Sequence, residues 1–251
     1  MSRGGYTLET LRDQRYDAVL HLFSAAVGAP KFYNHDNAAR YETVDEAKAS
    51  DEQLRHMYIG HPRLKLIDNS TSFQQKLDRG LDFVYEVIGH NKPQHQMRRF
   101  AVRDAPKPAD LKIPHVVVEV KISVLTGSTK DNVRMLFRRE QGASILYMYH
   151  ALSYEGVGFK TTMQHNISQR EYTNMLEQRD PNHVDVLKTA ISFTENGHFC
   201  ELSTFHEPEW CAGYSSLYVD CDKDDETLPG WLKIDKDTTG NSDYSTYAVS
   251  L

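Results

Sequence analysis

The stretch VVVEVKISVL, residues 116–125, decides the fold class of this chain of 251 residues. It is rich in β-branched residues and carries polar residues at alternate positions, a pattern typical of a strand at a sheet surface. Six more segments share this texture: 133–139, 145–150, 158–164, 188–194, 200–205 and 215–219. Turn pairs connect several of them, and the Asn196-Gly197 pair is the strongest hairpin signal. We expect a mostly antiparallel sheet or barrel with inserted helices.

Upstream of this region the texture changes. Residues 16–24 (YDAVLHLFS) and 64–67 are short apolar runs that indicate buried strands. Each is followed by a helix with a capping box, formed by Thr43 with Glu46 and by Ser72 with Gln75. The second helix carries its apolar residues on one face, at Phe73, Leu77, Leu81, Val84 and Ile88. The order strand–helix–strand–helix predicts an α/β layer with parallel strands.

A polar, proline-containing segment separates the two regions, because residues 104–114 hold three prolines. We therefore predict an α+β chain with two domains, residues 1–92 and residues 93–251. A further helix, capped by Ser168 and Glu171, interrupts the second domain.

Composition narrows the classes of function. The formal net charge of -6 argues against a nucleic-acid-binding protein. Three cysteines, Cys200, Cys211 and Cys221, show no pairing or zinc-ligand spacing, which favours a reducing compartment. We expect an intracellular protein, with the cytoplasm favoured and an organelle left open. Nowhere does the sequence hold the roughly 18 consecutive apolar residues of a transmembrane helix.

Motifs for phosphate transfer and for nucleophilic catalysis are missing from the sequence. Neither G-x-x-x-x-G-K-[ST] nor G-x-G-x-x-G occurs, so no loop of this chain can wrap nucleotide phosphates in the P-loop manner. There is also no G-x-S-x-G motif, and the twelve histidines show no metal-ligand spacing. These absences favour a protein that is not an enzyme.

Charged residues on the predicted strands form the most informative set. If their faces point into a barrel, the cations would bind phosphate oxygens and the acids would hold a divalent cation. The candidate anion-binding residues are Lys121, Arg134, Arg138, Arg139, Lys160 and Lys188. The candidate metal ligands are Glu119, Glu201 and Asp220. The alternative is that these charges decorate solvent-facing surfaces.

Short landmarks along almost the whole chain resemble the TRPL translocation defect protein 14 family. In the first region they include Gly60-His61-Pro62 and Ile67-Asp68-Asn69-Ser70-Thr71, and in the second Gln178-Arg179-Asp180, Lys188-Thr189 and His206-Glu207-Pro208. The resemblance implies the later half of a kinase-like P-loop domain, lacking its P-loop, followed by a CYTH-like barrel related to triphosphate tunnel proteins. It would place Arg40 in a lid over phosphates, and Asp68 and Asn69 near the nucleotide base.

The chain departs from the tunnel pattern that this resemblance implies. Tunnel enzymes carry a Glu-x-Glu-x-Lys strand, and residues 117–121 offer only its last two positions, Glu119 and Lys121. Mg²⁺ with a phosphorylated ligand would be the cofactor of such a barrel, and fewer carboxylates would weaken its chemistry.

Three functions remain open from the sequence. The first is a non-enzymatic CYTH-like subunit of a larger assembly that retains a phosphate ligand in its barrel. The second is a trafficking adaptor that binds a phosphoinositide or a nucleotide. The third is a metal-dependent triphosphate hydrolase that uses Glu119, Lys121, Arg138 and Asp220. The expected partners are accordingly other protein subunits and a phosphoinositide or triphosphate ligand.

Overall fold

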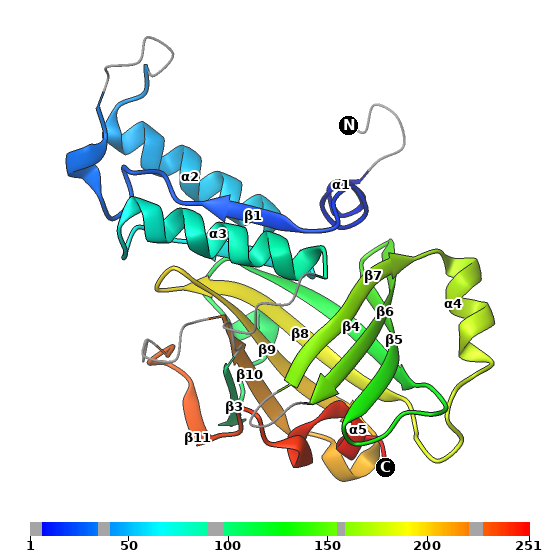
Figure 1. Ribbon diagram of the computed structural model, residues 1–251. Helices are drawn as coiled ribbons and strands as arrows, with labels where there is room; N and C mark the ends of the chain where they lie inside the picture. The colour runs from blue at the N-terminus through cyan, green and yellow to red at the C-terminus, as the bar shows by residue number, and fades with distance from the viewer. Residues whose placement is uncertain (1–6, 35–40, 90–97, 155–158, 221–227) are drawn as a thin grey trace.

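A computed structural model describes residues 7–34, 41–89, 98–154, 159–220 and 228–251 (Figure 1). Its centre is a nine-stranded sheet with the order β11-β3-β10-β9-β8-β4-β5-β6-β7, in which all neighbours are antiparallel. The strands are β3 (Arg98–Arg103), β4 (His115–Val124), β5 (Asn132–Gln141), β6 (Ser144–Tyr154), β7 (Phe159–Ile167), β8 (Val186–Glu195), β9 (His198–Glu207), β10 (Ser215–Val219) and β11 (Lys233–Asp237).

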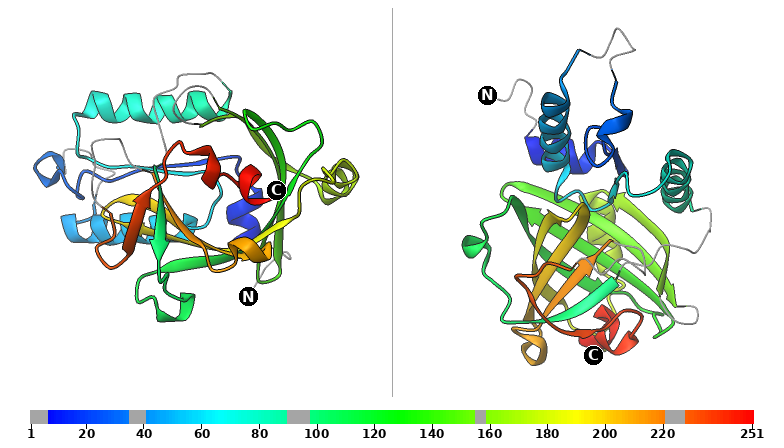
Figure 2. Two further views of the ribbon diagram at one scale, coloured as in Figure 1. Left: turned by 90° about the horizontal axis from the view of Figure 1, so that it is seen from below. Right: turned by 90° about the vertical axis from the view of Figure 1, so that its left-hand side faces the viewer.

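The sheet curves strongly but the expected barrel is not closed. β7 and β11 form the two edges, and among the described residues they do not pair with each other (Figure 2). The curvature brings β5 and β9 together across its hollow side, since Val133 and Met135 share a buried cluster with Phe205. Strands three places apart in a flat sheet would lie about 14 Å apart. We call this hollow side the inner face and the other side the outer face.

Apolar cores lie on both faces of the curved sheet. The inner core includes Val118, Val120, Ile122 and Val124, and Tyr247 of α5 (Thr246–Val249) packs against it. The outer core is centred on Phe193 and is covered by partly buried side chains from the segments before β4 and around β11, namely Ala105, Leu111, Ile113, Leu228 and Ile234. A third cluster lies under α4 (Gln169–Leu176). The alternating strand pattern is thus used on both sides.

Turn and cap residues act where the sequence predicts them. The hairpin between β8 and β9 turns at Asn196 and Gly197, both with positive φ angles of 50° and 84°. Such angles favour Asn and Gly because a β-carbon crowds the backbone there. The capping box of Ser168 and Glu171 begins α4 as expected. Short helices complete this region, η2 (Pro108–Asp110), η3 (Glu209–Cys211) and η4 (Ser242–Tyr244).

The α/β block, residues 7–34 and 41–89, confirms the predicted order of strand and helix. It comprises α1 (Leu8–Gln14), β1 (Val19–Leu22), η1 (Pro30–Phe32), α2 (Val44–Tyr58), β2 (Leu64–Ile67) and α3 (Phe73–Val87). β1 and β2 pair in parallel, and both predicted capping boxes are formed. α2 and α3 cover opposite faces of this two-stranded sheet (Figure 2).

The α/β block sits on one end of the curved sheet. Arg12 donates hydrogen bonds to Gln141 and to the carbonyl of Ile59, and Arg63 donates to the carbonyl of Gln164. Phe23 joins Phe199 of β9 in one apolar cluster. At this junction β2 is mostly buried, whereas every residue of β1 is at least partly exposed.

Candidate functional site

A polar cluster lies on the inner face, above the apolar core. Arg139 of β5 and Lys188 of β8 converge on Glu201 of β9. The Glu201 carboxylate lies 3.7 Å from the Arg139 guanidinium and 3.4 Å from Lys188 Nζ. Lys188 Nζ also donates a 2.8 Å hydrogen bond to Ser203 Oγ. Two cations therefore share one carboxylate in a largely buried setting.

The electrostatics of this cluster favour negative charge. Burial alone would raise the pKa of Glu201, but Lys188 and Arg139 beside it lower that pKa below its ordinary value. The carboxylate therefore stays ionised. Because it has a single charge, it cannot balance both cations.

His150 of β6 lies on the same inner face, where Arg139 and Lys188 act on it electrostatically. Burial, reinforced by Arg139, Arg63 and the other nearby cations, lowers the pKa of His150 to about 3. The ring stacks on Phe137 at a centroid distance of 4.1 Å. Its Nε2 atom is buried and has no hydrogen-bond partner among the described residues. A neutral, unpartnered imidazole beside surplus cations is a site where an anion would be stabilised.

Further polar groups line the same face. Ser192 of β8 faces inward opposite Glu201, and its buried Oγ lacks a hydrogen-bond partner in the described part of the chain. Arg99 of β3 lies over Tyr218 of β10 and donates to its hydroxyl at 3.1 Å. Arg99 also donates to the carbonyls of Asn241 and Tyr244, which ties the C-terminal segment to the sheet.

The structure separates the predicted site residues by face. Arg139, Lys188 and Glu201 come together on the inner face. Glu119, Lys121, Arg134 and Arg138 lie on the outer face, which is the alternative that the sequence left open for these charges. The reason is the two-residue alternation of a strand, since Val118 and Val120 occupy the inward positions of β4.

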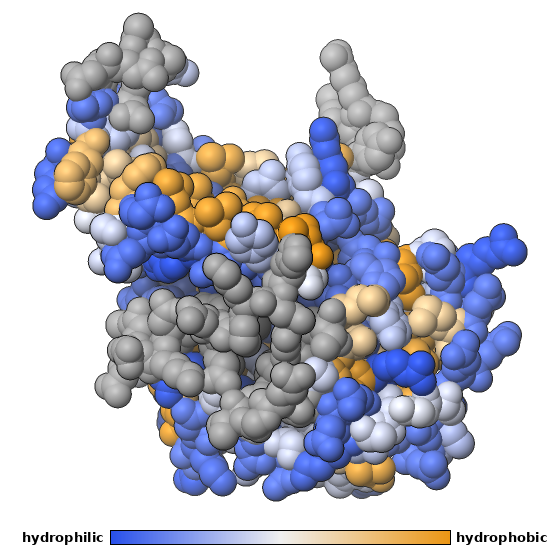
Figure 3. Space-filling model, in the orientation of Figure 1, coloured by the Kyte–Doolittle hydropathy of each residue, from blue (hydrophilic) through white to orange (hydrophobic). Residues whose placement is uncertain are grey.

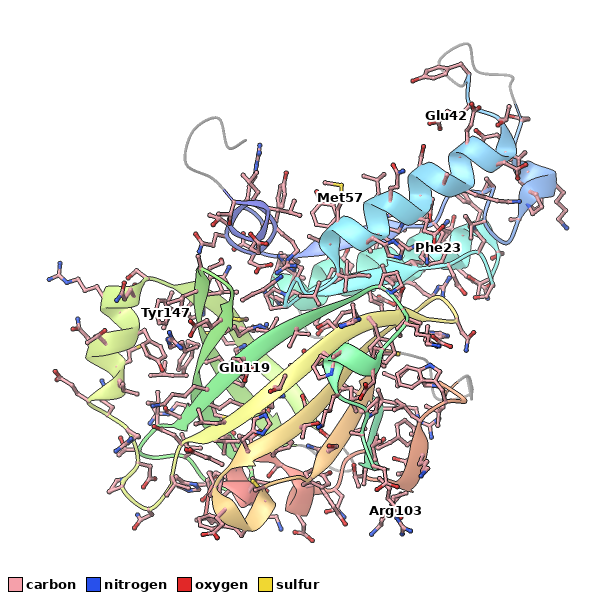
Figure 4. The ribbon with its side chains drawn as sticks, turned by 180° about the vertical axis from the view of Figure 1, so that it is seen from behind. Phe23, Glu42, Met57, Arg103, Glu119 and Tyr147 are labelled. Atoms are coloured by element: carbon pink, nitrogen blue, oxygen red, sulfur yellow. The ribbon has the colours of Figure 1, made fainter. Side chains whose placement is uncertain are left out.

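The outer-face residues have partners of their own. Glu119, which is labelled on β4 in Figure 4, accepts a hydrogen bond from Thr189 Oγ1. Lys121 pairs with Asp185 at 2.7 Å, and Arg138 pairs with Glu140 at 2.6 Å. Arg134 donates to the carbonyl of Thr126. These are surface interactions, of a kind that contributes little to stability.

The remaining predicted residues lie elsewhere. Asp220 follows β10 and pairs with Lys65 of β2 at 2.7 Å, where the α/β block meets the sheet. Asp68 pairs with Arg79, and Asn69 donates to the carbonyls of Ser24 and Val27, so both hold the block together. Arg40 and the side chain of Lys160 lie outside the described residues.

Among the described residues, the inner-face side chains do not fit a magnesium ion. Mg²⁺ requires several oxygen ligands in octahedral geometry. The three predicted ligands are dispersed: Glu119 faces outward, Asp220 binds Lys65, and Glu201 is occupied by two cations. In the described ranges, no group of three or more His, Cys, Asp or Glu side chains is arranged to hold a metal ion.

Three inner-face residues escaped the sequence analysis. Arg99 lies on β3, a strand that begins directly after the polar linker, and its alternation in Arg98-Arg99-Phe100-Ala101-Val102-Arg103 was the available signal. His150 and Ser192 lie on predicted strands, but only their pairing partners show that they face inward.

No helix in the described residues is long and apolar enough to cross a membrane.

Comparisons with known proteins give faint likenesses. No family model and no curated protein matches this chain, so the resemblance to the TRPL translocation defect protein 14 family is not supported. Two structures of NE1496, titled a hypothetical protein and an inorganic triphosphatase, are 20% and 19% identical with a TM-score of 0.42. They cover 62% and 64% of this chain, and 97% of each of theirs.

A third structure, PH1819 protein from Pyrococcus horikoshii OT3, is 10% identical with a TM-score of 0.39. The match covers 51% of this chain and 78% of the PH1819 chain. Likenesses of this degree fix neither the family nor the function of the chain.

Proposed function

We propose that this protein binds a multiply charged phosphate compound on the inner face of its curved sheet and does not hydrolyse it. The observation that carries the proposal is the convergence of the two cations Arg139 and Lys188 on the single carboxylate of Glu201, on the same face as His150, whose Nε2 has no hydrogen-bond partner among the described residues. A buried charge without a counter-charge is costly, and a bound anion would remove that cost.

The chemistry of the residues suits phosphate oxygens. Arg139 can donate two parallel hydrogen bonds to a phosphate, and Lys188 adds a compact charge beside it. Ser192 Oγ and His150 Nε2 are the polar atoms with spare hydrogen-bonding capacity. In the free protein Glu201 takes the position of counter-ion to both cations. A ligand with several phosphates would compete with Glu201 for them.

The donor set supports the proposal of binding without hydrolysis. Metal-assisted attack on a phosphoanhydride needs carboxylates that hold the metal against the phosphates. Glu201 is the one carboxylate engaged with the inward cations Arg139 and Lys188 in the described residues, and these two cations already hold both of its oxygens. The proposal therefore assigns recognition, rather than catalysis, to the inner face.

Calorimetric titration with tripolyphosphate tests the proposal. Parallel titrations with ATP and with inositol 1,4,5-trisphosphate distinguish which kind of phosphate compound binds. Arg139→Gln should weaken tripolyphosphate binding at least tenfold. Arg138→Gln is the matched control, because it is the adjacent residue on the opposite face and pairs with Glu140. Equal losses in the two variants, or no binding of any of the three compounds at millimolar concentration, would overturn the proposal.

A second arm addresses hydrolysis. Release of phosphate from tripolyphosphate is followed with Mg²⁺ or Mn²⁺ present, and the expected result is none above background. Release that is abolished in Glu201→Gln would instead establish the hydrolase. A role as a subunit of a larger assembly remains the second candidate, because the α/β block exposes apolar side chains on α3.

A further inference from the structure

α3 presents its most apolar side to solvent. Phe73, Leu77, Leu81, Val84 and Ile88, here called the apolar stripe, are all exposed, Phe73 to 74% and Ile88 to 62%. The side that packs on the block instead carries Lys76 and Gly80. Figure 3 shows the stripe as a continuous apolar band along α3. A helix normally packs such a stripe against a core. In the described residues of a single chain, no surface covers the apolar stripe.

Within the described residues, β1 pairs with β2 alone, which leaves its other edge without a strand partner. The amide of Val19 donates to the carbonyl of Arg63, just before β2, and the amide of Phe23 donates to the carbonyl of Ile67 in β2. Because alternate residues of a strand point their backbone groups in opposite directions, the N–H and C=O groups of Leu20 and Leu22 face away from β2. The strand β2 is mostly buried whereas β1 is half exposed. An open edge of this kind accepts another strand.

A groove of about 560 Å³ runs along this edge. It is lined by three consecutive residues of β1, Leu20, His21 and Leu22, and by Ala47 and Leu54 of α2. Successive residues of a strand point to opposite faces, so a groove that contacts all three lies against the edge itself. This position beside β1 and α2 is where the next strand of a three-layer α/β sheet would lie.

We propose that a second copy of this chain fills this position, with β1 pairing antiparallel to β1 of its partner across a twofold axis. Centring the pair on His21 sets Leu20 opposite Leu22 of the other copy, and the reverse. These are the residues whose backbone groups are unpaired, so the register satisfies all of them with four hydrogen bonds. The result is a four-stranded sheet with both α3 helices side by side on one face.

The exposed area agrees with a twofold pair. The apolar stripe, Tyr85 and Leu22 together expose on the order of 600 Å² in each copy, so a pair would bury roughly 1,200 Å². Specific interfaces begin at about 1,000 Å². Asp78, Asp82 and Glu86 lie on the opposite side of α3, at steps of four, and would stay in solvent. The dimer therefore brings apolar surfaces together without opposing these acids.

Light scattering behind size exclusion tests the dimer. The chain of 28.8 kDa should elute at twice that mass, and Leu81→Asp should convert it to a monomer. Val184→Asp is the matched control, because Val184 is an exposed apolar residue remote from α3 and should leave the dimer intact. Circular dichroism shows whether each variant is folded.

Amide hydrogen exchange tests the register. In the dimer the amides of Leu20 and Leu22 should exchange at least tenfold more slowly than in Leu81→Asp, whereas the amide of Phe23, bonded to β2 in both, should change little. A wild-type chain that is monomeric at 100 µM overturns the proposal. So does a dimer that survives Leu81→Asp or leaves the amides of Leu20 and Leu22 unprotected.

Discussion

The two regions of this molecule differ in what they leave unsatisfied. In the α/β block the buried Asp51 lies beside His21 and Arg55 and accepts from the amide of Ser24, whereas the buried Lys76 donates to neutral groups, the carbonyl of Phe23 and the side chain of Asn69. The apolar side chains of this block, however, remain exposed along α3. The curved sheet does the reverse, since it covers apolar cores on both faces and retains surplus positive charge around His150.

The difference indicates what each region would bind. Covering exposed apolar area with another protein surface lowers the free energy, and the partner needs a complementary shape rather than a charge. Buried positive charge is lowered in free energy by an anion, which supplies charge and little area. One chain thus offers two sites of different chemistry, and experiments on matched residues in the two regions can separate them.

The largest contrast is expected in the apolar cores. Phe193 is fully buried in the outer core of the sheet, so Phe193→Ala should lower the free energy of unfolding by about 3–5 kcal/mol. Leu81→Ala in the apolar stripe should cost under about 1 kcal/mol in dilute protein, because half of that side chain is already in water. Urea unfolding at low protein concentration measures both. A large loss in Leu81→Ala would mean that the stripe is covered within one chain.

The second contrast concerns the two buried carboxylates. Glu201→Gln leaves Arg139 and Lys188 without a counter-ion, and Asp51→Asn leaves His21 and Arg55 in the same position. Each should cost about 2–3 kcal/mol in urea unfolding. Glu201→Gln should in addition bind tripolyphosphate more tightly, because the competing carboxylate is gone. Asp51→Asn should bind it unchanged, since Asp51 lies in the other region.

Titration calorimetry on the same two variants decides between recognition and catalysis. A ligand held by cations alone gains affinity in Glu201→Gln. A ligand held through a metal on Glu201 loses affinity in that variant when Mg²⁺ is present. Weaker binding in Glu201→Gln would therefore contradict the proposed function.

Local structure was predictable from the sequence because its signals are local. The capping residues at Thr43, Ser72 and Ser168 and the Asn196-Gly197 turn depend on groups within four residues. The stripe on α3 was also found from spacing alone. Its exposure was not, because burial depends on which surfaces the rest of the chain supplies.

The inner-face site was predicted only in part. A strand has two faces, and the sequence does not say which of them lies on the concave side of the curved sheet. Arg138 and Arg139 are adjacent and chemically alike, yet only Arg139 reaches Glu201. The register with β4, which sets Arg139 opposite the buried Val120, fixes this choice. Such pairing is a long-range contact, and one residue of slippage would have reversed the assignment.

The third contrast is between two partly buried histidines, His150 and His21, as the pH falls. Burial lowers the pKa of both, but His150 is surrounded by cations and falls to about 3, whereas Asp51 partly restores the pKa of His21. A histidine whose folded pKa is depressed stabilises the protein above the unfolded value of about 6.5, and this stability is lost as the pH falls toward the folded value. For His150 the loss is about 1.4 kcal/mol per pH unit, or about 2 kcal/mol at pH 5.

His150→Gln should therefore flatten the dependence of unfolding free energy on pH between 6.5 and 4 more than His21→Gln does. Saturating tripolyphosphate should reduce the difference, because a bound anion stabilises the protonated imidazole and raises the pKa of His150. Urea unfolding at several pH values, with and without tripolyphosphate, measures both effects. Equal slopes in the two variants would mean that the surroundings of His150 lower its pKa no more than those of His21 do, which would contradict surplus positive charge on the inner face.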